Sequence, residues 1–453
     1  MGFSTFTPRS SNRINILTGL MTSIYERKND SFFQNLYSIS FLVVILIGAV
    51  GMLVALSMFN IGIDVQLLID FAPQMLVILQ FALIISLVAL LVGIVQVIFT
   101  SWFGEEIVLI AMWVTPFLVM SASLYLYTNT NNVDYLGGLV AGAIFLILVY
   151  IFRRSLRLSA RLIEVGAEIT RDNLVMMRPQ LGAYFLKTVV SLLMVPGVVT
   201  VFLTSATIHP ILGGVLAIIY EMMYFFVMSG IQAVANAKNI SYVNQWYTSN
   251  PSAAKAGKQV SKMKSGILKY AFLMAFVARF RRNSGASPLS LFKFMKFSNW
   301  PRLIFGGGSI TSTASKAIAY FGSYTLVVMV VKKMNSLGAA YKESASTVFK
   351  TFAANIAGSM GFNVIDGLRR LISSLLLLGI GVYFAFLTYG NNIVLIVVVA
   401  FIFLILGSVP LDSMFQPVVN SYHVLLYRAY TGSASSKMDK RTKDIIQEAK
   451  KKK

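Results

Sequence analysis

The sequence predicts an all-α, polytopic transmembrane helical bundle, and three observations support this fold class. Of the 453 residues, 57% are hydrophobic and only 12% are charged, whereas soluble proteins carry about 25% charged residues. The mean hydropathy of the chain is +0.73. The apolar residues also gather in uninterrupted runs of about 20, the length that crosses a bilayer as a helix.

Eight apolar runs predict membrane spans, and up to ten spans are compatible with the sequence. They follow a polar leader over residues 1–38 and belong to a single transmembrane domain over 39–430. A tight turn at Gly104, Glu105 and Glu106 is expected between the second and third spans, because the hydropathy falls there. The eight spans cover about 39–59, 75–100, 106–127, 135–152, 183–206, 210–237, 368–389 and 393–411.

The distribution of basic residues predicts the orientation of the chain. The 39 Lys and Arg residues exceed the 17 Asp and Glu residues, which gives a net charge of +22. Basic residues gather in the segments 153–182, 238–264 and 279–302, so the positive-inside rule places these loops in the cytoplasm. Four crossings separate the leader from the first of them. We therefore expect a multi-pass protein of the cell membrane with both termini in the cytoplasm.

The excess of basic residues also predicts the binding partners of the cytoplasmic surface. In a soluble protein it would indicate nucleic acid, but basic residues interleaved with aromatic residues in stacking modules are missing here. We therefore expect no nucleic-acid partner and instead expect attraction to anionic lipid headgroups. Arg153, Arg154 and Arg157, directly after the fourth span, are the expected headgroup contacts.

Two segments are predicted to be amphipathic helices at the inner membrane interface. In the first, Leu158 and Leu162 share one helical face, while Arg157 and Arg161 share another. This helix is expected to continue directly from the fourth span. The second amphipathic helix is expected over residues 340–362, where apolar residues recur at helical spacing.

Two further regions lack a simple span pattern. Within 265–333, the apolar runs 266–278 and 317–331 lie between basic flanks that belong on one side of the membrane. Either the two runs form a short transmembrane hairpin, or both are interfacial or re-entrant. The basic cytoplasmic tail over 431–453 ends in consecutive lysines and is expected to be disordered.

Glu221 is the strongest candidate for a functional residue, because it interrupts the apolar run 211–235 near its middle. An unpaired charge at the bilayer midplane costs several kcal/mol, on the order of 3. Tyr220 and Tyr224 lie beside it at helical spacing, and aromatic faces attract organic cations such as quaternary ammonium groups. The alternative is a protonated Glu221 that forms a hydrogen bond with a neighbouring helix.

Three other residues are candidates for the same site. Trp113 in the third span would supply a further aromatic wall, and the alternative is a tryptophan that packs in the core or faces lipid. Pro196 and Gly197 lie in the middle of the fifth span, where proline removes a backbone hydrogen bond. We interpret them as a hinge in a broken helix that lines a cavity, or alternatively as an ordinary tolerated kink.

No residue pattern predicts catalysis, a metal site or a cofactor. The absence of cysteine excludes disulfides and thiolate metal sites, and the two histidines, His209 and His423, are far apart in sequence. The sequence has no Ser/His/Asp set within one region, no HExxH motif and no paired intramembrane aspartates. We therefore expect that the protein is not an enzyme.

Several segments from the fourth span onward occur in a recognisable order. They are the apolar run with its arginine cluster over 146–157, the small-residue stretch 228–236 leading to Trp246 and Tyr247, and the segments 344–366 and 409–415. This arrangement resembles the choline transporter-like family over residues 140–430, without a sharp signature motif. The chain lacks the large cysteine-bearing external loop that animal members carry after the first span.

The resemblance and the site around Glu221 together imply a function. They predict a transporter-like membrane protein that moves a small organic cation such as choline, with Glu221 as the counter-charge. The alternative is a non-transporting membrane scaffold or partner-binding subunit that uses the amphipathic helices and the basic tail. The sequence predicts no oligomeric state.

Overall fold

The computed structural model describes residues 30–58, 65–283, 324–350, 352–390, 393–432 and 435–450. Every regular element within these ranges is a helix, which agrees with the predicted all-α class. Six segments of the described chain are long and apolar enough to cross a membrane. They are Ser31–Val54, Ile84–Thr130, Val133–Asp172, Leu174–Ala206, Pro210–Thr248 and Arg369–Leu387. The chain is therefore a membrane-embedded helical protein, while the count of eight spans stays a prediction.

The helices follow one another with short connections. In chain order they are α2 (Asp30–Met58), α3 (Val65–Thr130), η1 (Val133–Tyr135), α4 (Leu136–Asp172), η2 (Leu174–Met176), α5 (Met177–Leu192), α6 (Met194–Ala206), α7 (Pro210–Thr248), α8 (Ala253–Lys262), α9 (Lys264–Asn283), α12 (Leu337–Lys350), α13 (Phe352–Tyr389), α14 (Ile393–Thr431) and α15 (Lys440–Lys450). A further short helix covers residues 324–332.

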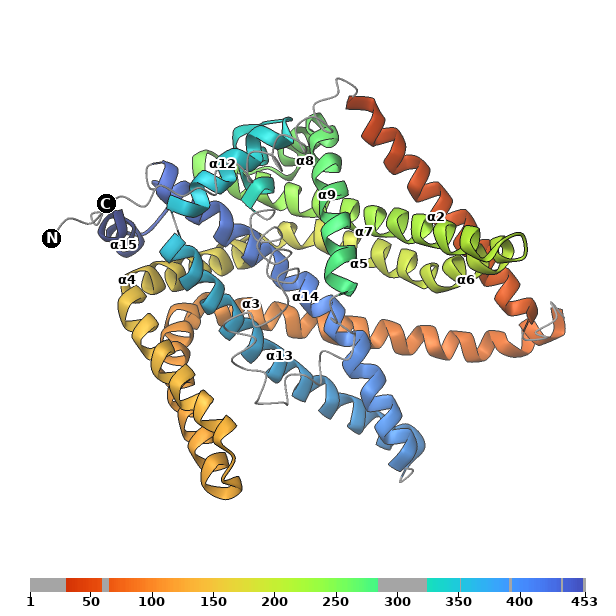
Figure 1. The fold of residues 1–453 in the computed structure, drawn as a ribbon, viewed down its shortest axis with the longest axis horizontal. Coiled ribbons are helices and arrows are strands. Elements are labelled where there is room, and N and C mark those ends of the chain that lie inside the picture. The colour runs from red at the N-terminus through yellow and green to blue at the C-terminus, as the bar shows by residue number, and fades with distance from the viewer. Residues whose placement is uncertain are drawn as a thin grey trace.

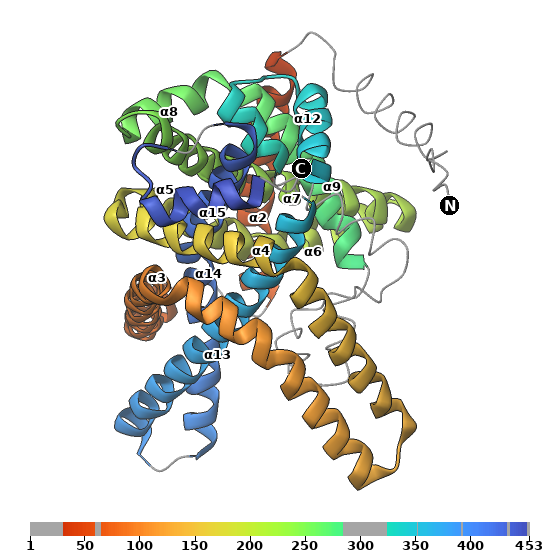
Figure 2. The same ribbon diagram turned by 90° about the vertical axis from the view of Figure 1, so that its left-hand side faces the viewer.

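Two helical hairpins project from the body of the molecule (Figure 1). One joins the second half of α3 to the first half of α4, and the other joins α13 to α14. Figure 2 shows the two hairpins diverging from each other. A separate group contains α2, α5, α6 and α7, in which α7 packs against each of the other three.

The predicted turn at Gly104, Glu105 and Glu106 is wrong, because α3 continues through these residues as one helix of 66 residues. The helix bends in this region instead (Figure 1). Glu164 of α4 reaches the bend, where its Oε2 accepts a hydrogen bond of 2.7 Å from the backbone N–H of Glu105. Gly104 permits this approach, since a Cβ there would lie 3.3 Å from the Glu164 Cα. A side chain that reaches the backbone is a known cause of helix bending.

The short helix 324–332 lies in the interior of the fold. Its side chains Tyr324, Val328 and Met329 are fully buried among residues of α4, α7, α9 and α14. The run 266–278 belongs to α9, which also contributes buried residues to this core. The apolar runs within 265–333 therefore pack against the rest of the chain where they are described, and residues 284–323 lie outside the described ranges.

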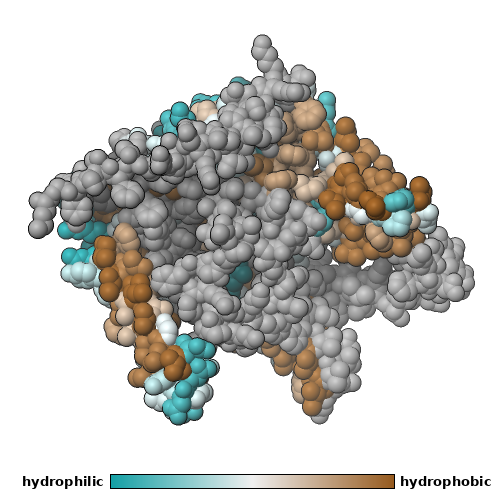
Figure 3. Space-filling view, viewed as in Figure 1, coloured by the Kyte–Doolittle hydropathy of each residue, from teal (hydrophilic) through white to brown (hydrophobic). Residues whose placement is uncertain are grey.

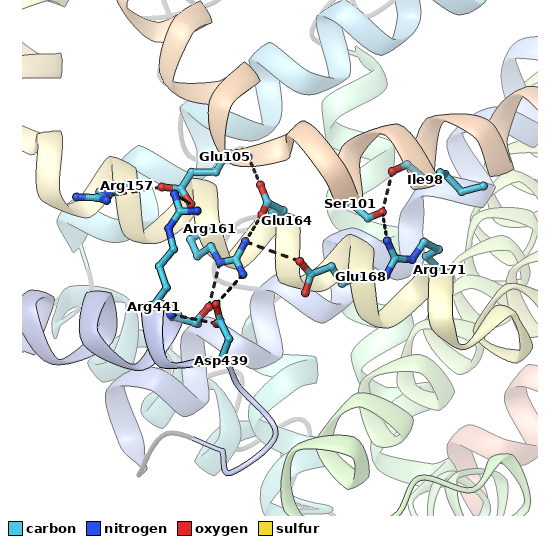
Figure 4. A network of polar contacts seen from close by, with 11 residues as sticks. Ile98, Ser101, Glu105, Arg157, Arg161, Glu164, Glu168, Arg171, Asp439 and Arg441 are labelled. Atoms are coloured by element: carbon cyan, nitrogen blue, oxygen red, sulfur yellow. Dashed lines mark hydrogen bonds and ion pairs between the residues drawn. The ribbon is translucent and has the colours of Figure 1, made fainter.

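The tail was expected to be disordered, but residues 440–450 form α15, which packs on α4. Ion pairs fasten it in place (Figure 4). Asp439 Oδ2 lies 3.2 Å from Arg161 Nη2, and Arg441 Nη2 lies 2.9 Å from Glu105 Oε2. Ion pairs with α3 and α4 thus hold residues 440–450 in an ordered helix, although the lysine-rich composition predicts disorder.

Large apolar side chains remain exposed on several helices. They cover much of the α3–α4 hairpin and the region of α2 and α6 (Figure 3). Leu46 on α2 and Val140 on α4 are 56% and 60% exposed. Exposed apolar surface on this scale is unfavourable in water and matches contact with lipid.

Candidate functional site

The carboxylate of Glu221 lies on α7, a helix whose first turn is well specified. Pro210 occupies the first helical position, where its missing N–H removes no bond. The side chain of His209 caps the helix by accepting a hydrogen bond of 3.2 Å at Nδ1 from the Ile211 N–H. Three turns further along, Glu221 is half-buried in the group formed with α2, α5 and α6.

Tyr220 is buried, with only 2% of its surface exposed, and its hydroxyl reaches two other helical segments. The oxygen lies 3.2 Å from the backbone oxygens of Val44 in α2 and Leu193 between α5 and α6. A tyrosine hydroxyl has one proton, so it donates to one of these carbonyls at a time. Tyr220 therefore ties α7 to both neighbours through its hydroxyl.

The hinge predicted at Pro196 and Gly197 coincides with an interruption between α5, which ends at Leu192, and α6, which begins at Met194. Pro196 has no N–H to offer the preceding turn. Any Cβ at Gly197 would overlap the ring and hydroxyl of Tyr220. The structure thus brings Tyr220, Pro196 and Gly197 together at one helix break.

Tyr224 lies one turn further along α7 and is also buried. Its hydroxyl is 3.2 Å from Ser191 Oγ of α5, and either oxygen can donate this hydrogen bond. The two tyrosines are therefore packed between helices, with 2% and 7% of their surfaces exposed. In this conformation they do not present open ring faces to a bound cation.

Trp113 is not part of this group. It lies on the part of α3 that forms a hairpin with α4, and its side chain is 41% exposed. The helices that pack along α3 are α4, α13 and α14, whereas Tyr220 packs with α2 and with the end of α5. This position matches the lipid-facing alternative for Trp113.

A set of polar side chains that the sequence analysis did not identify joins α5, α7 and α14. Lys187 Nζ donates to Gln232 Oε1 at 2.8 Å, and Gln232 Nε2 donates to Asn236 Oδ1 at 3.0 Å. Asn420 Nδ2 of α14 donates to the same Asn236 oxygen at 3.2 Å. We call this set the polar ladder; its members are Gln180, Lys187, Gln232, Asn236, Gln416 and Asn420.

Asn236 is the centre of the polar ladder. Its Oδ1 accepts hydrogen bonds from Gln180, Gln232 and Asn420, so three N–H groups share an oxygen with two lone pairs. Polar side chains that bond across helices replace water in an apolar environment. Asn236 therefore holds three helices in register.

Helical spacing could have found the polar ladder in the sequence. Gln232 and Asn236 lie four residues apart, as do Gln416 and Asn420, which places each pair on one helical face. Glu221 precedes Gln232 by eleven residues, close to three full turns. Glu221 and the ladder residues of α7 thus share one side of the helix.

The arginines predicted to contact lipid headgroups already have partners within the protein. Arg157 Nε lies 3.5 Å from Glu105 Oε1, and Arg154 Nε lies 3.5 Å from Glu448 Oε1. The guanidinium of Arg153 stacks over the Tyr150 ring at 5.0 Å from its centroid. Arg157 therefore links α4 to α3 and Arg154 links α4 to α15, while contact of the cluster with lipid headgroups stays a prediction.

Buried charges form the centre of the same network. Arg161 and Glu164 are paired on successive turns of α4, with side chains that are only 9% and 7% exposed. Arg161 Nε also donates to Thr442 Oγ1 of α15 at 3.0 Å. Figure 4 shows these groups converging between α3, α4 and α15. A buried charge requires such partners, because its desolvation is costly.

No protein-family model and no curated protein matches this chain. The resemblance to the choline transporter-like family therefore stays a prediction. Among the described residues, no group of three or more acidic or histidine side chains is placed to hold a metal ion.

Proposed function

We propose that this protein is a transporter-like membrane protein that moves a small organic cation, such as choline, along the contact between α5 and α7. The observation that supports this proposal is a succession of polar groups along α7, of which Tyr224 and the polar ladder also contact α5. Glu221, Tyr224 with Ser191, and the polar ladder follow one another along α7. Polar side chains within apolar helices are costly to bury and commonly mark solute paths.

The helix break at Pro196 supplies the movement that the path requires. Discontinuous helices line the sites of many transporters, because a break lets one half of a helix move relative to the other. Tyr220 closes this break by its bond to the Leu193 carbonyl. Release of this bond, together with the bond between Tyr224 and Ser191, would loosen α7 from the α5–α6 junction and open the tyrosine faces to a cation.

Glu221 would be the counter-charge for the cation, and uptake of labelled choline into liposomes tests this role. Glu221→Gln keeps the shape of the side chain but removes its charge, so we expect uptake to fall to the background level. Glu106→Gln on the exposed side of α3 is the matched control and should leave uptake unchanged. Full uptake by folded Glu221→Gln would reject the proposal.

A non-transporting membrane scaffold is the second candidate, and one observation favours it. The hydroxyls of Tyr220 and Tyr224 both bond to neighbouring helices, as expected of residues that fasten a static bundle. A scaffold predicts that Glu221→Gln changes thermal stability while neither protein takes up any quaternary ammonium compound. The same liposomes and variants therefore distinguish the two candidates.

A further inference from the structure

Acidic residues are absent from a long part of this sequence. Between Glu221 and Glu343 there is no Asp or Glu, while the same stretch holds sixteen Lys and Arg residues. This stretch supplies most of the net charge of +22. Its basic groups therefore lack acidic partners nearby in sequence, which points to anions outside the chain.

The helix α8 lies within this stretch and has two distinct faces. Ala256 and Val260 are buried, and Gln259 Nε2 donates to the Val330 backbone oxygen at 2.7 Å, so this face is held by the body of the protein. The other face carries Lys255, Lys258 and Lys262, which are exposed. Figure 2 shows α8 at the outer edge of the molecule.

Two more exposed lysines, Lys264 and Lys333, lie near the end of α8, at the start of α9 and after the helix 324–332. Gly266 near the start of α9 is in close contact with Asn335, since a Cβ there would lie 2.9 Å from the Asn335 backbone oxygen. This packing brings the exposed Lys264 and Lys333 toward the same region. We call the set the α8 basic face; it consists of Lys255, Lys258, Lys262, Lys264 and Lys333.

The five ammonium groups of the α8 basic face differ from the arginines of α4. Arg154 and Arg157 lie within 3.5 Å of carboxylates on other helices. Within the described residues, none of the five lysines has an ion pair or a side-chain hydrogen bond. The neighbouring Lys332 is paired with Glu343 and is therefore not counted in the face.

We propose that the α8 basic face docks on the anionic phospholipid headgroups of the membrane in which the protein is embedded. The predicted span 210–237 lies within α7, and about 16 Å of the same helix separates its end from Thr248. Only residues 249–252 then lead to α8, so the headgroups of that leaflet are the nearest source of phosphate. Lysine is a compact point charge that attracts phosphate without fixed geometry. Each lysine at such a surface strengthens the attraction roughly fivefold, and salt weakens it.

The absence of cysteine makes a direct test available. Ser261→Cys places a single fluorescent label on the exposed side of α8. The full chain is reconstituted in nanodiscs of phosphatidylcholine alone or with one third phosphatidylglycerol, each containing a headgroup-linked quencher. We expect several-fold stronger quenching in the anionic discs and loss of this difference in high salt. Equal quenching in both lipids would overturn the proposal.

Matched variants test whether the lysines cause the effect. Replacing Lys255, Lys258 and Lys262 by Gln should remove the lipid dependence, whereas replacing Arg153, Lys440 and Lys443 on α4 and α15 by Gln removes the same charge and should preserve it. If the triple variant does not fold, the loss of quenching in high salt still tests the proposal on the protein with an unsubstituted α8 basic face. An equal loss in both triple variants, or a label response to single-stranded RNA in place of anionic lipid, would reject lipid docking.

Discussion

At the break between α5 and α6, the ring of Tyr220 packs directly on Gly197 and occupies the space that any larger residue at position 197 would need. The hydroxyl of the same tyrosine lies 3.2 Å from the Leu193 carbonyl at the break. One side chain therefore both fills the gap beside α6 and reaches a backbone carbonyl that also accepts a hydrogen bond from the Gly197 N–H. The small residue is required by packing, independently of any glycine backbone preference.

Gly197→Ala should destabilise the protein, because the added methyl group overlaps Tyr220. Overpacking of this kind costs about 1–3 kcal/mol. Gly182→Ala in α5 is the matched control, since a Cβ there meets no atom within 4 Å and should be neutral or stabilising. Thermal unfolding in detergent measures the melting temperatures of both variants. Equal values would contradict the close packing of Tyr220 on Gly197.

Asn236→Leu should destabilise the contact between α5, α7 and α14, because three N–H donors lose their shared acceptor. Each orphaned buried donor costs about 1–3 kcal/mol, although relaxation will reduce the sum. Gln416→Leu removes one long bond of 3.5 Å at the edge of the ladder and should cost less. Thermal unfolding ranks the two, and the reverse order would show that Asn236 is not the centre.

Arg161→Met should destabilise the protein strongly, because it leaves the buried Glu164 carboxylate without its guanidinium partner. Breaking one side of a buried pair costs about 3–5 kcal/mol. Arg154→Met removes a solvent-exposed pair with Glu448 and should cost less than about 1 kcal/mol. Denaturant unfolding in detergent compares them, and a similar loss in both variants would place Arg161 in a water-accessible setting.

Attachment of α15 should weaken in acid. Burial opposes ionisation of Asp439, but bonds from Thr442 and the charge of Arg161 outweigh it and hold the pKa of Asp439 below its ordinary value of 3.8. A lowered folded-state pKa stabilises the docked helix above the unfolded value, and this contribution is lost as the pH falls through the folded value. We therefore expect α15 to loosen below about pH 4.

The loosening of α15 is measured by the fluorescence anisotropy of a label attached to the cysteine of the Gln447→Cys variant. Asp439→Asn should loosen α15 already at neutral pH and remove the acid transition. Asp444→Asn, at an exposed position of α15, is the control and should keep the transition. An unchanged acid transition in Asp439→Asn would assign it to another carboxylate of the network.

Hydropathy predicted the helical membrane class because the bilayer selects long apolar helices whatever their neighbours. It could not predict that Glu105 is buried, with a side chain only 2% exposed and paired with arginines from α4 and α15. The arginines that neutralise this residue are distant in sequence, and a hydropathy profile averages only over neighbouring residues. The same reason explains why the profile assigned a turn to a helical segment.

The function of the candidate site stays a prediction, but the structure shows which of its residues lie together. Tyr220, Pro196 and Gly197 were each identified from local patterns, and the structure joins them. Trp113 was grouped with them by residue type alone, and tertiary packing places it on another hairpin. The polar ladder was missed because single amides within apolar runs look tolerable until their partners on other helices are known.

The continuity of α3 bears on the parity of the membrane topology. Because α3 bends near Glu105 without a reversing loop, its two arms belong either to one bent span or to the separate second and third predicted spans. One crossing by α3 would give α2, α3 and α4 three crossings, which puts residue 30 and the arginines that follow the span in α4 on opposite sides, whereas two crossings by α3 would put them on the same side. Labelling of single cysteines from each side of a vesicle distinguishes odd from even parity, and an odd result would place the leader outside the cell.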